Sequence, residues 1–160
     1  MKNVKYLFGA LFLLLAMSSI TNAKDWRGIV PLHSTVEDVE KLLGKPRVAG
    51  YYVYETEEGQ VMFGYQTNLD PSCGKGYKPY NVPFRTVLFI QIESKKKPLL
   101  VDLNLNMSKF TLYPTCFGAT GYSNNEEGFG MHVYEKAVST FYYSASAIDE
   151  KKYACPKANE

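Results

Sequence analysis

The longest unbroken run of hydrophobic residues lies close to the start of the chain. Two lysines stand among the first five residues, an apolar run follows over 6–17, and the segment ends in Thr21-Asn22-Ala23. A basic start, a short apolar core and small residues near the cleavage point are typical of a secretory signal peptide. A membrane-spanning helix needs about 20 apolar residues, so this run is too short for one. We therefore predict a signal peptide over 1–23, cleavage between Ala23 and Lys24, and no stable membrane insertion of the remaining chain.

The next clear pattern has the period of an amphipathic helix. Four apolar residues share one helical face: Val36, Val39, Leu42 and Leu43. Ser34 or Thr35 can cap the helix, and an acid three residues later completes a capping box. Gly44 suits the C-terminal end, and Pro46 prevents continuation. The sequence therefore predicts a short helix of about three turns.

After this helix the period changes from that of a helix to that of a strand. Alternating aromatic and β-branched residues predict strands over 51–55, 61–65, 84–93, 99–105, 117–122, 129–133 and 138–143. In the strand over 129–133, alternation places His132 on the outer face. We expect one α+β domain over 24–146, with the short N-terminal helix packed on an antiparallel sheet of six or seven strands. A polar C-terminal tail over 147–160 should be loosely held apart from Cys155. The segment 26–32 should enter the domain in an extended conformation.

Charge excludes one class of partner. Two of the 18 Lys and Arg residues lie in the predicted signal, which holds no acid, so the remaining chain balances its 16 Asp and Glu residues. Nucleic-acid binding would call for a clustered basic surface. The only tight basic run is Lys95-Lys96-Lys97, which we interpret as a solvated turn. We therefore expect no nucleic-acid partner.

The three cysteines are Cys73, Cys116 and Cys155. Export places them in an oxidising compartment, where disulfides persist. Cys73 and Cys155 lie in turn-rich stretches, whereas Cys116 begins a predicted aromatic strand and suits a buried position. We predict a Cys73–Cys155 disulfide and a free thiol at Cys116.

Two stretches of the chain resemble known bacterial proteins. The segment 28–46, followed by Tyr52 and Tyr54, resembles the helix-then-hairpin opening of the small outer-membrane-assembly lipoproteins of the SmpA/OmlA type and of the β-lactamase-inhibitory-protein fold. The whole mature chain is similar to a set of secreted bacterial proteins without an assigned function, which share Tyr80 to Pro83 and Ser108 to Phe110. The chain departs from the lipoproteins because no lipid-bearing cysteine stands near the cleavage point.

Catalytic motifs do not emerge from the sequence. It holds no nucleophile elbow, zinc-protease motif, phosphate loop or dinucleotide fingerprint. The paired acids Glu57-Glu58 and Glu126-Glu127 stand at glycine-containing turns, where we expect solvated side chains rather than a glycosidase pair. We predict no metal and no cofactor.

The connection over 67–83 is the most informative candidate for binding. It exceeds the usual hairpin loop and mixes tyrosines with lysines, and exposed tyrosines make binding contacts at low entropic cost. The predicted binding residues are Trp26, Lys75, Tyr77, Lys78 and Tyr80. The alternative interpretation is a loop packed on its own tyrosines and pinned by Cys73. We expect a secreted or periplasmic, non-enzymatic module that binds a protein or another envelope component. The alternative function is a small envelope-associated hydrolase that uses Asp or Glu residues.

Overall fold

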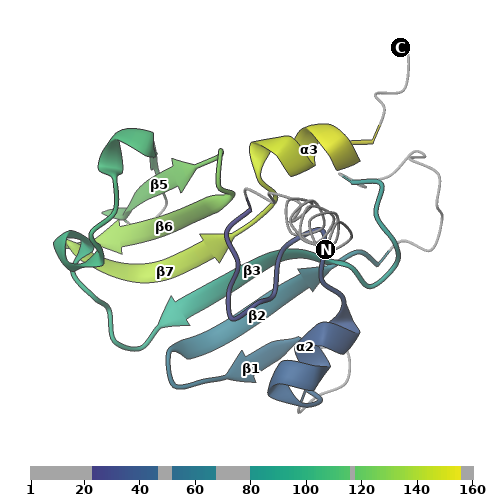
Figure 1. Cartoon of the computed structure of the whole chain (residues 1–160). Helices are drawn as coiled ribbons and strands as arrows, with labels where there is room; N and C mark the ends of the chain where they lie inside the picture. The colour runs from purple at the N-terminus through teal and green to yellow at the C-terminus, as the bar shows by residue number, and fades with distance from the viewer. Residues whose placement is uncertain (1–22, 47–51, 68–79, 116–117, 156–160) are drawn as a thin grey trace, which may run out of the picture.

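The centre of the fold is a single antiparallel sheet. The computed structural model describes residues 23–46, 52–67, 80–115 and 118–155. Seven strands run in the order β1-β2-β3-β7-β6-β5-β4 (Figure 1). They are β1 (Val53–Glu55), β2 (Gly59–Tyr65), β3 (Val87–Ser94), β4 (Thr111–Pro114), β5 (Thr120–Asn124), β6 (Phe129–Tyr134) and β7 (Ala137–Tyr143). The α+β class with an antiparallel sheet of this size is confirmed.

The predicted helix is present as α2 (Val36–Leu43). Thr35 is the cap: its Oγ1 accepts from the Asp38 N–H at 3.4 Å, and Asp38 Oδ2 accepts from the Thr35 N–H at 2.8 Å. Gly44 closes the helix at φ +80°, where a side chain would be strained. The apolar face of α2 enters the core over β1–β3, so this helix covers one end of the sheet rather than its full width.

The predicted strand over 99–105 is wrong. This segment forms two 3₁₀ turns, η1 (Leu100–Leu103) and η2 (Met107–Lys109), with Asn104 in the left-handed region at φ +51°. Leu100 and Leu103, three residues apart, both contact the core of the second half of the sheet, while Val101 is 78% exposed. Leu105 packs on the same core, so Leu103 and Leu105 are half-buried as alternation predicts, but the backbone reaches this arrangement through 3₁₀ turns rather than a strand.

The loosely held C-terminal tail is also wrong for residues 147–153, which form α3 (Ala147–Tyr153). Ser146 Oγ accepts from the Asp149 N–H at 3.2 Å and donates to Asp149 Oδ2 at 2.8 Å. The other carboxylate oxygen lies 2.9 Å from His33 Nε2. Asp149 is only 4% exposed, so these contacts fix α3 to the segment that precedes α2.

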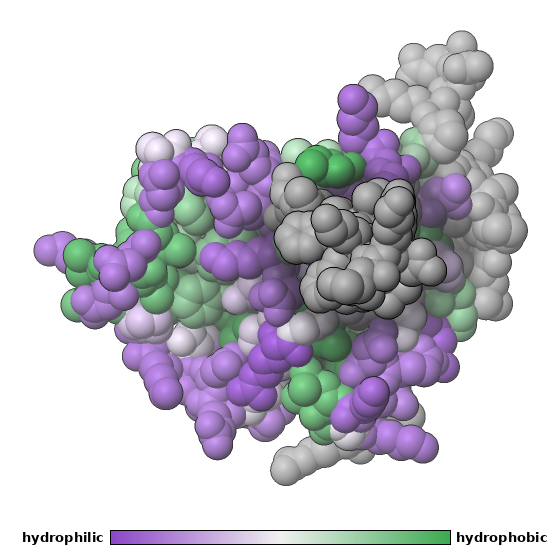
Figure 2. Space-filling model, in the orientation of Figure 1, coloured by the Kyte–Doolittle hydropathy of each residue, from purple (hydrophilic) through white to green (hydrophobic). Residues whose placement is uncertain are grey.

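One face of the sheet carries the hydrophobic cores. The first core lies over β1–β3 and is covered by α2 and the N-terminal segment, and the second lies over β6 and β7. Figure 1 shows the N-terminal segment crossing in front of the sheet before it reaches α2. That segment is not extended as predicted, because Arg27, Gly28 and Leu32 have positive φ. Figure 2 shows the same side as mostly hydrophilic, with hydrophobic atoms over β5 and β6.

No helix of the described residues is long and apolar enough to cross a membrane.

Candidate binding site on the open sheet face

The face opposite the cores has its own set of side chains. Strand register aligns Glu93 on β3 with Thr140 on β7, then His132 on β6, Gly121 on β5 and Tyr113 on β4. Because residues alternate between faces along a strand, this row points away from the cores. Among the described residues, none of its side chains belongs to a core cluster. We call this side of the sheet the open face.

A histidine between two tyrosines forms the centre of the open face. His132 Nε2 lies 3.3 Å from the hydroxyl of Tyr113, and Nδ1 lies 3.1 Å from the hydroxyl of Tyr142. Burial lowers the pKa of His132 from its usual 6.5, so the neutral ring is favoured. A neutral imidazole has one donor and one acceptor nitrogen, so one phenol accepts from the ring and the other donates to it. The first phenol keeps its own hydrogen for a further partner, and the two phenols exchange roles when the tautomer changes.

Glycines let two aromatic rings lie flat on the open face. A Cβ on Gly121 would overlap carbons of the Tyr113 ring, and a Cβ on Gly64 would overlap carbons of the Phe89 ring. Each ring therefore lies across the glycine of the neighbouring strand, a packing that stabilises glycines within sheets. Phe89 remains 40% exposed and Tyr113 38% exposed, so both rings also present surface to solvent.

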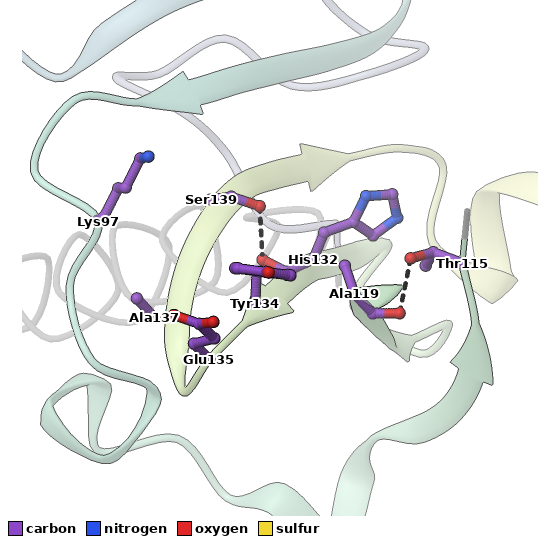
Figure 3. A pocket seen from close by; sticks show the side chains of 8 residues that line it. All are labelled: Lys97, Thr115, Ala119, His132, Tyr134, Glu135, Ala137 and Ser139. Carbon is purple, nitrogen blue, oxygen red and sulfur yellow. Dashed lines mark hydrogen bonds between the residues drawn. The ribbon is translucent and has the colours of Figure 1, made fainter. Parts of the chain in front are cut away.

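Two adjoining cavities lie along the same face. The larger, of about 770 Å³, is lined by Lys97, Thr115, Ala119, His132, Tyr134, Glu135, Ala137 and Ser139 (Figure 3). In Figure 3, Lys97 stands on one side, Thr115 and Ala119 on the other, and His132 and Tyr134 between them. The second cavity, of about 480 Å³, shares Lys97 and Ser139 with the first and extends to Glu55 and Glu93. Together they form a shallow groove with a mixed polar and apolar lining beside the His132 cluster.

A β-bulge shapes the groove at Ser139. The register of β6 and β7 shifts between His132 and Val133, which leaves Ser139 as the extra residue. Its Oγ donates to the backbone oxygen of His132 at 3.2 Å. Because Ser139 is the extra residue, Thr140 lies on the open face while Val138, two residues earlier on β7, enters the second core.

The charged groups of the groove are mixed in sign. Lys95 pairs with Glu55 at 3.4 Å, and Gln60 Nε2 donates to the same carboxylate at 3.0 Å. Lys97 and Glu93 line the groove, and neither forms an ion pair with another described residue. Neither sign dominates, so the groove suits a ligand recognised mainly by hydrogen bonds.

A third cavity, of about 740 Å³, lies beside η1. Its apolar lining includes Leu100, Leu105, Met107, Tyr122 and Val133, and Asn104, Thr120, Glu135 and Lys136 add polar groups. None of the three residues of the His132 cluster lines it, so we do not include it in the candidate site.

Another histidine has a structural role. In the group Ser146–Asp149–His33, the serine bonds to the aspartate rather than to the imidazole, so it lacks the serine–imidazole contact of a nucleophilic triad. Among the described residues, no three His, Cys, Asp or Glu side chains come together as a metal site would require.

Of the predicted binding residues, Trp26 and Tyr80 are described, and neither lies on this face. Trp26 is 4% exposed, and its Nε1–H donates to Glu58 Oε2 at 2.7 Å, so its binding role stays a prediction. Tyr80 is half-buried, and its hydroxyl donates to Glu150 at 3.2 Å beside α3. Lys75, Tyr77 and Lys78 lie outside the described residues, so their role stays a prediction.

The cysteines are only partly described. Cys155 is disulfide-bonded, whereas Cys73 and Cys116 lie outside the described residues. The Cys73–Cys155 pairing and the free thiol at Cys116 stay predictions.

The structure confirms that His132 points to the outer face of its strand, as the alternation of residues along β6 predicts. Sequence reasoning missed Tyr113, Tyr142 and Phe89 as partners on the same face. The sequence signal for this face was the presence of Gly64 and Gly121 within strands, each of which pairs with an aromatic residue. These pairs can be recognised only when the strand order is known, and no local pattern gives that order.

Comparison with known proteins adds a fold relationship. A similar solved structure is a DUF4309 family protein (YjgB) from Bacillus subtilis, with a TM-score of 0.50 and 14% sequence identity. The match covers 75% of this chain and 84% of that chain. At this identity the likeness concerns the fold alone. No family model matches the chain, and no curated protein sequence does. The resemblance to the assembly lipoproteins and the β-lactamase inhibitory protein stays a prediction.

Proposed function

We propose that this chain is an exported, non-enzymatic binding module, secreted or periplasmic, whose ligand surface is the open face of its sheet. The observation that carries the proposal is the Tyr113–His132–Tyr142 cluster, which adjoins a cavity of about 770 Å³. Cavities of this size with a few oriented polar groups are typical ligand sites. The cluster lies on rigid paired strands, which hold its geometry before a ligand arrives.

The hydrogen bonds around His132 support binding rather than catalysis. Both of its nitrogens are engaged by phenols, and Ser139 Oγ donates to a backbone oxygen rather than to the ring. A serine nucleophile would need its hydroxyl bonded to a base. Glu55, one of the three carboxylates in the groove, is held by Gln60 and Lys95. A hydrolase that uses Glu55 and Glu93 is the alternative, and it predicts turnover of the bound material.

Export is the second part of the proposal. Its support is the signal-like segment 1–23 and the way Lys24 is held immediately after it. The Lys24 N–H donates to the backbone oxygen of Glu127 at 2.8 Å, and its ammonium lies 3.9 Å from the centroid of the Phe129 ring. The disulfide at Cys155, which we assign to Cys73, suits an oxidising compartment.

The test is sedimentation of the mature protein with envelope material of the producing cells. Thr140→Arg places a long charged side chain in the middle of the open face, and Leu42→Arg places the same side chain on the exposed surface of α2. We expect Thr140→Arg to lower the bound fraction at least tenfold and Leu42→Arg to leave it unchanged, with both variants folded by circular dichroism. Equal binding by all three proteins, or none by the wild type, would refute the proposal. Release of soluble fragments from the material would favour the hydrolase.

A further inference from the structure

The open face has two exposed aromatic rings, Phe89 and Tyr113, with polar side chains between them. We call these two rings the platforms. Phe89 lies over Gly64 on β2, and Tyr113 lies over Gly121 on β5. Four strand intervals separate β2 from β5 in the sheet order, which is about 19 Å across the sheet. Between the rings stand Gln91, Tyr142 and the row from Glu93 to His132. A ligand that contacts both rings must therefore be extended.

The rings are oriented to offer their faces. A ring that lies flat across a glycine presents one face to the sheet and the other to solvent. The outward face is apolar and electron-rich. Phe89 is 40% exposed although it is one of the largest apolar side chains on this face. The matching ligand surface is flat and made of C–H groups.

The polar groups between the rings match hydroxyls. A hydroxyl group donates one hydrogen bond and accepts others. The Tyr113–His132–Tyr142 cluster offers one phenol hydrogen and one phenol oxygen, and it can exchange them by changing the tautomer of His132. Thr140 and Gln91 add side chains that both donate and accept. These side chains select ligands weakly by their charge and strongly by groups that both donate and accept hydrogen bonds.

From these observations we infer that the open face binds an extended carbohydrate chain of several sugar units. Sugar rings combine flat C–H faces with hydroxyl edges. They can therefore stack on the two platforms and form hydrogen bonds with the polar side chains between them. A folded protein partner would need a larger apolar contact area than two separated rings provide. The inference rests on the proposed function, because it names the ligand class of that same site.

The experiment repeats the sedimentation assay after two treatments of the envelope material. Periodate cleaves the vicinal diols of sugars, and a broad protease removes proteins. Retention is the fraction of the protein that sediments with the material. We expect periodate treatment to abolish retention of the wild type, as Thr140→Arg does, and protease treatment to leave it unchanged. Retention that is sensitive to Thr140→Arg but resists periodate, or is lost with protease, would overturn the carbohydrate assignment while the binding module stands. Retention insensitive to Thr140→Arg would overturn both.

Ring variants test the platform directly. Phe89→Leu keeps an apolar side chain over Gly64 but removes the ring face, and Phe89→Trp enlarges that face. We expect the leucine variant to lose at least tenfold in affinity for periodate-sensitive material and the tryptophan variant to retain binding. The matched control is Phe84→Leu, the same change at an exposed phenylalanine that lines neither cavity of the groove, for which we expect less than a threefold change. Equal binding by Phe89→Leu and the wild type would refute ring stacking.

Discussion

At the scale of single residues, His132 is the group whose protonation the fold opposes. Burial lowers its pKa below the 6.5 of the unfolded chain. When the pH falls below about 6.5, the unfolded chain takes up the proton first, so stability is complete above that pH and is lost as the pH falls towards the folded pKa. We expect His132→Gln to remove this contribution. The measurement is the urea midpoint of both proteins at pH 5 and pH 7.5, where the wild type should lose more than the variant. Parallel losses would contradict the prediction.

Two buried tyrosines, Tyr54 and Tyr65, have hydroxyls that find no hydrogen-bond partner among the described residues. Burial raises the pKa of Tyr65, so its phenol stays protonated. An unsatisfied buried hydroxyl costs about 1–3 kcal/mol, whereas the ring contact with Tyr52 does not need the oxygen. We expect Tyr65→Phe to raise the free energy of unfolding by about 1 kcal/mol, measured by urea denaturation. Tyr142→Phe is the control: its hydroxyl is bonded to His132, so the same chemical change should destabilise.

At the scale of elements, α3 is held by one buried carboxylate. Asp149 binds Ser146, the cap of the helix, and His33, which lies before α2. Asp149→Ala leaves both partners without their acceptor, so we expect a loss of about 2–3 kcal/mol in the free energy of unfolding and faster amide exchange over 147–153. Lys151→Ala, an exposed change in the same helix, should stay within about 0.5 kcal/mol. A loss of similar size in both variants would mean that helix propensity, not the carboxylate, decides.

Elements with a local signal were predictable, and those defined by distant contacts were not. The cap signal at Ser34 or Thr35 and the stop at Gly44 are local, and they predicted α2, although its eight residues make a shorter helix than the three turns expected. The edge strand β4 (Thr111–Pro114) is exposed along its whole length, so it has no alternation of burial to detect. The start of α3 did carry the cap signal Ser146-x-x-Asp149, but the helix buries few apolar residues, and its anchor is the distant His33.

The candidate site divides in the same way. Alternation along β6 predicts the outward position of His132. Its hydrogen-bond partners Tyr113 and Tyr142 come from β4 and β7. No local pattern indicates that β7 lies on one side of β6, or that β5 and then β4 follow on the other side. The tyrosine-rich connection over 67–83 was predicted to bind because its signals are local, whereas the open face brings together residues from strands that are far apart in the sequence.

At the scale of the whole molecule, the central β3–β7 pair joins two half-sheets. Ile90 pairs with Tyr143 and Ile92 with Phe141, and both aromatic residues contact the first and the second core. The cores therefore share side chains on one face, and the open face remains continuous across the junction. An extended ligand can cross from β2 to β5 only because of this continuity.

Export makes the last prediction at this scale. Lys24, the first residue after the predicted cleavage point, is held on Glu127 and Phe129. Signal peptidases require a small residue before the scissile bond, so Ala23→Tyr should block cleavage, whereas Asn22→Gln, one position earlier, should not. Intact-mass spectrometry of protein from the exported fraction should give a chain that begins at Lys24 for the wild type and for Asn22→Gln. An exported product that retains Met1, or that begins within α2, would contradict the predicted cleavage point, because a product that begins within α2 would lack the contacts of Lys24.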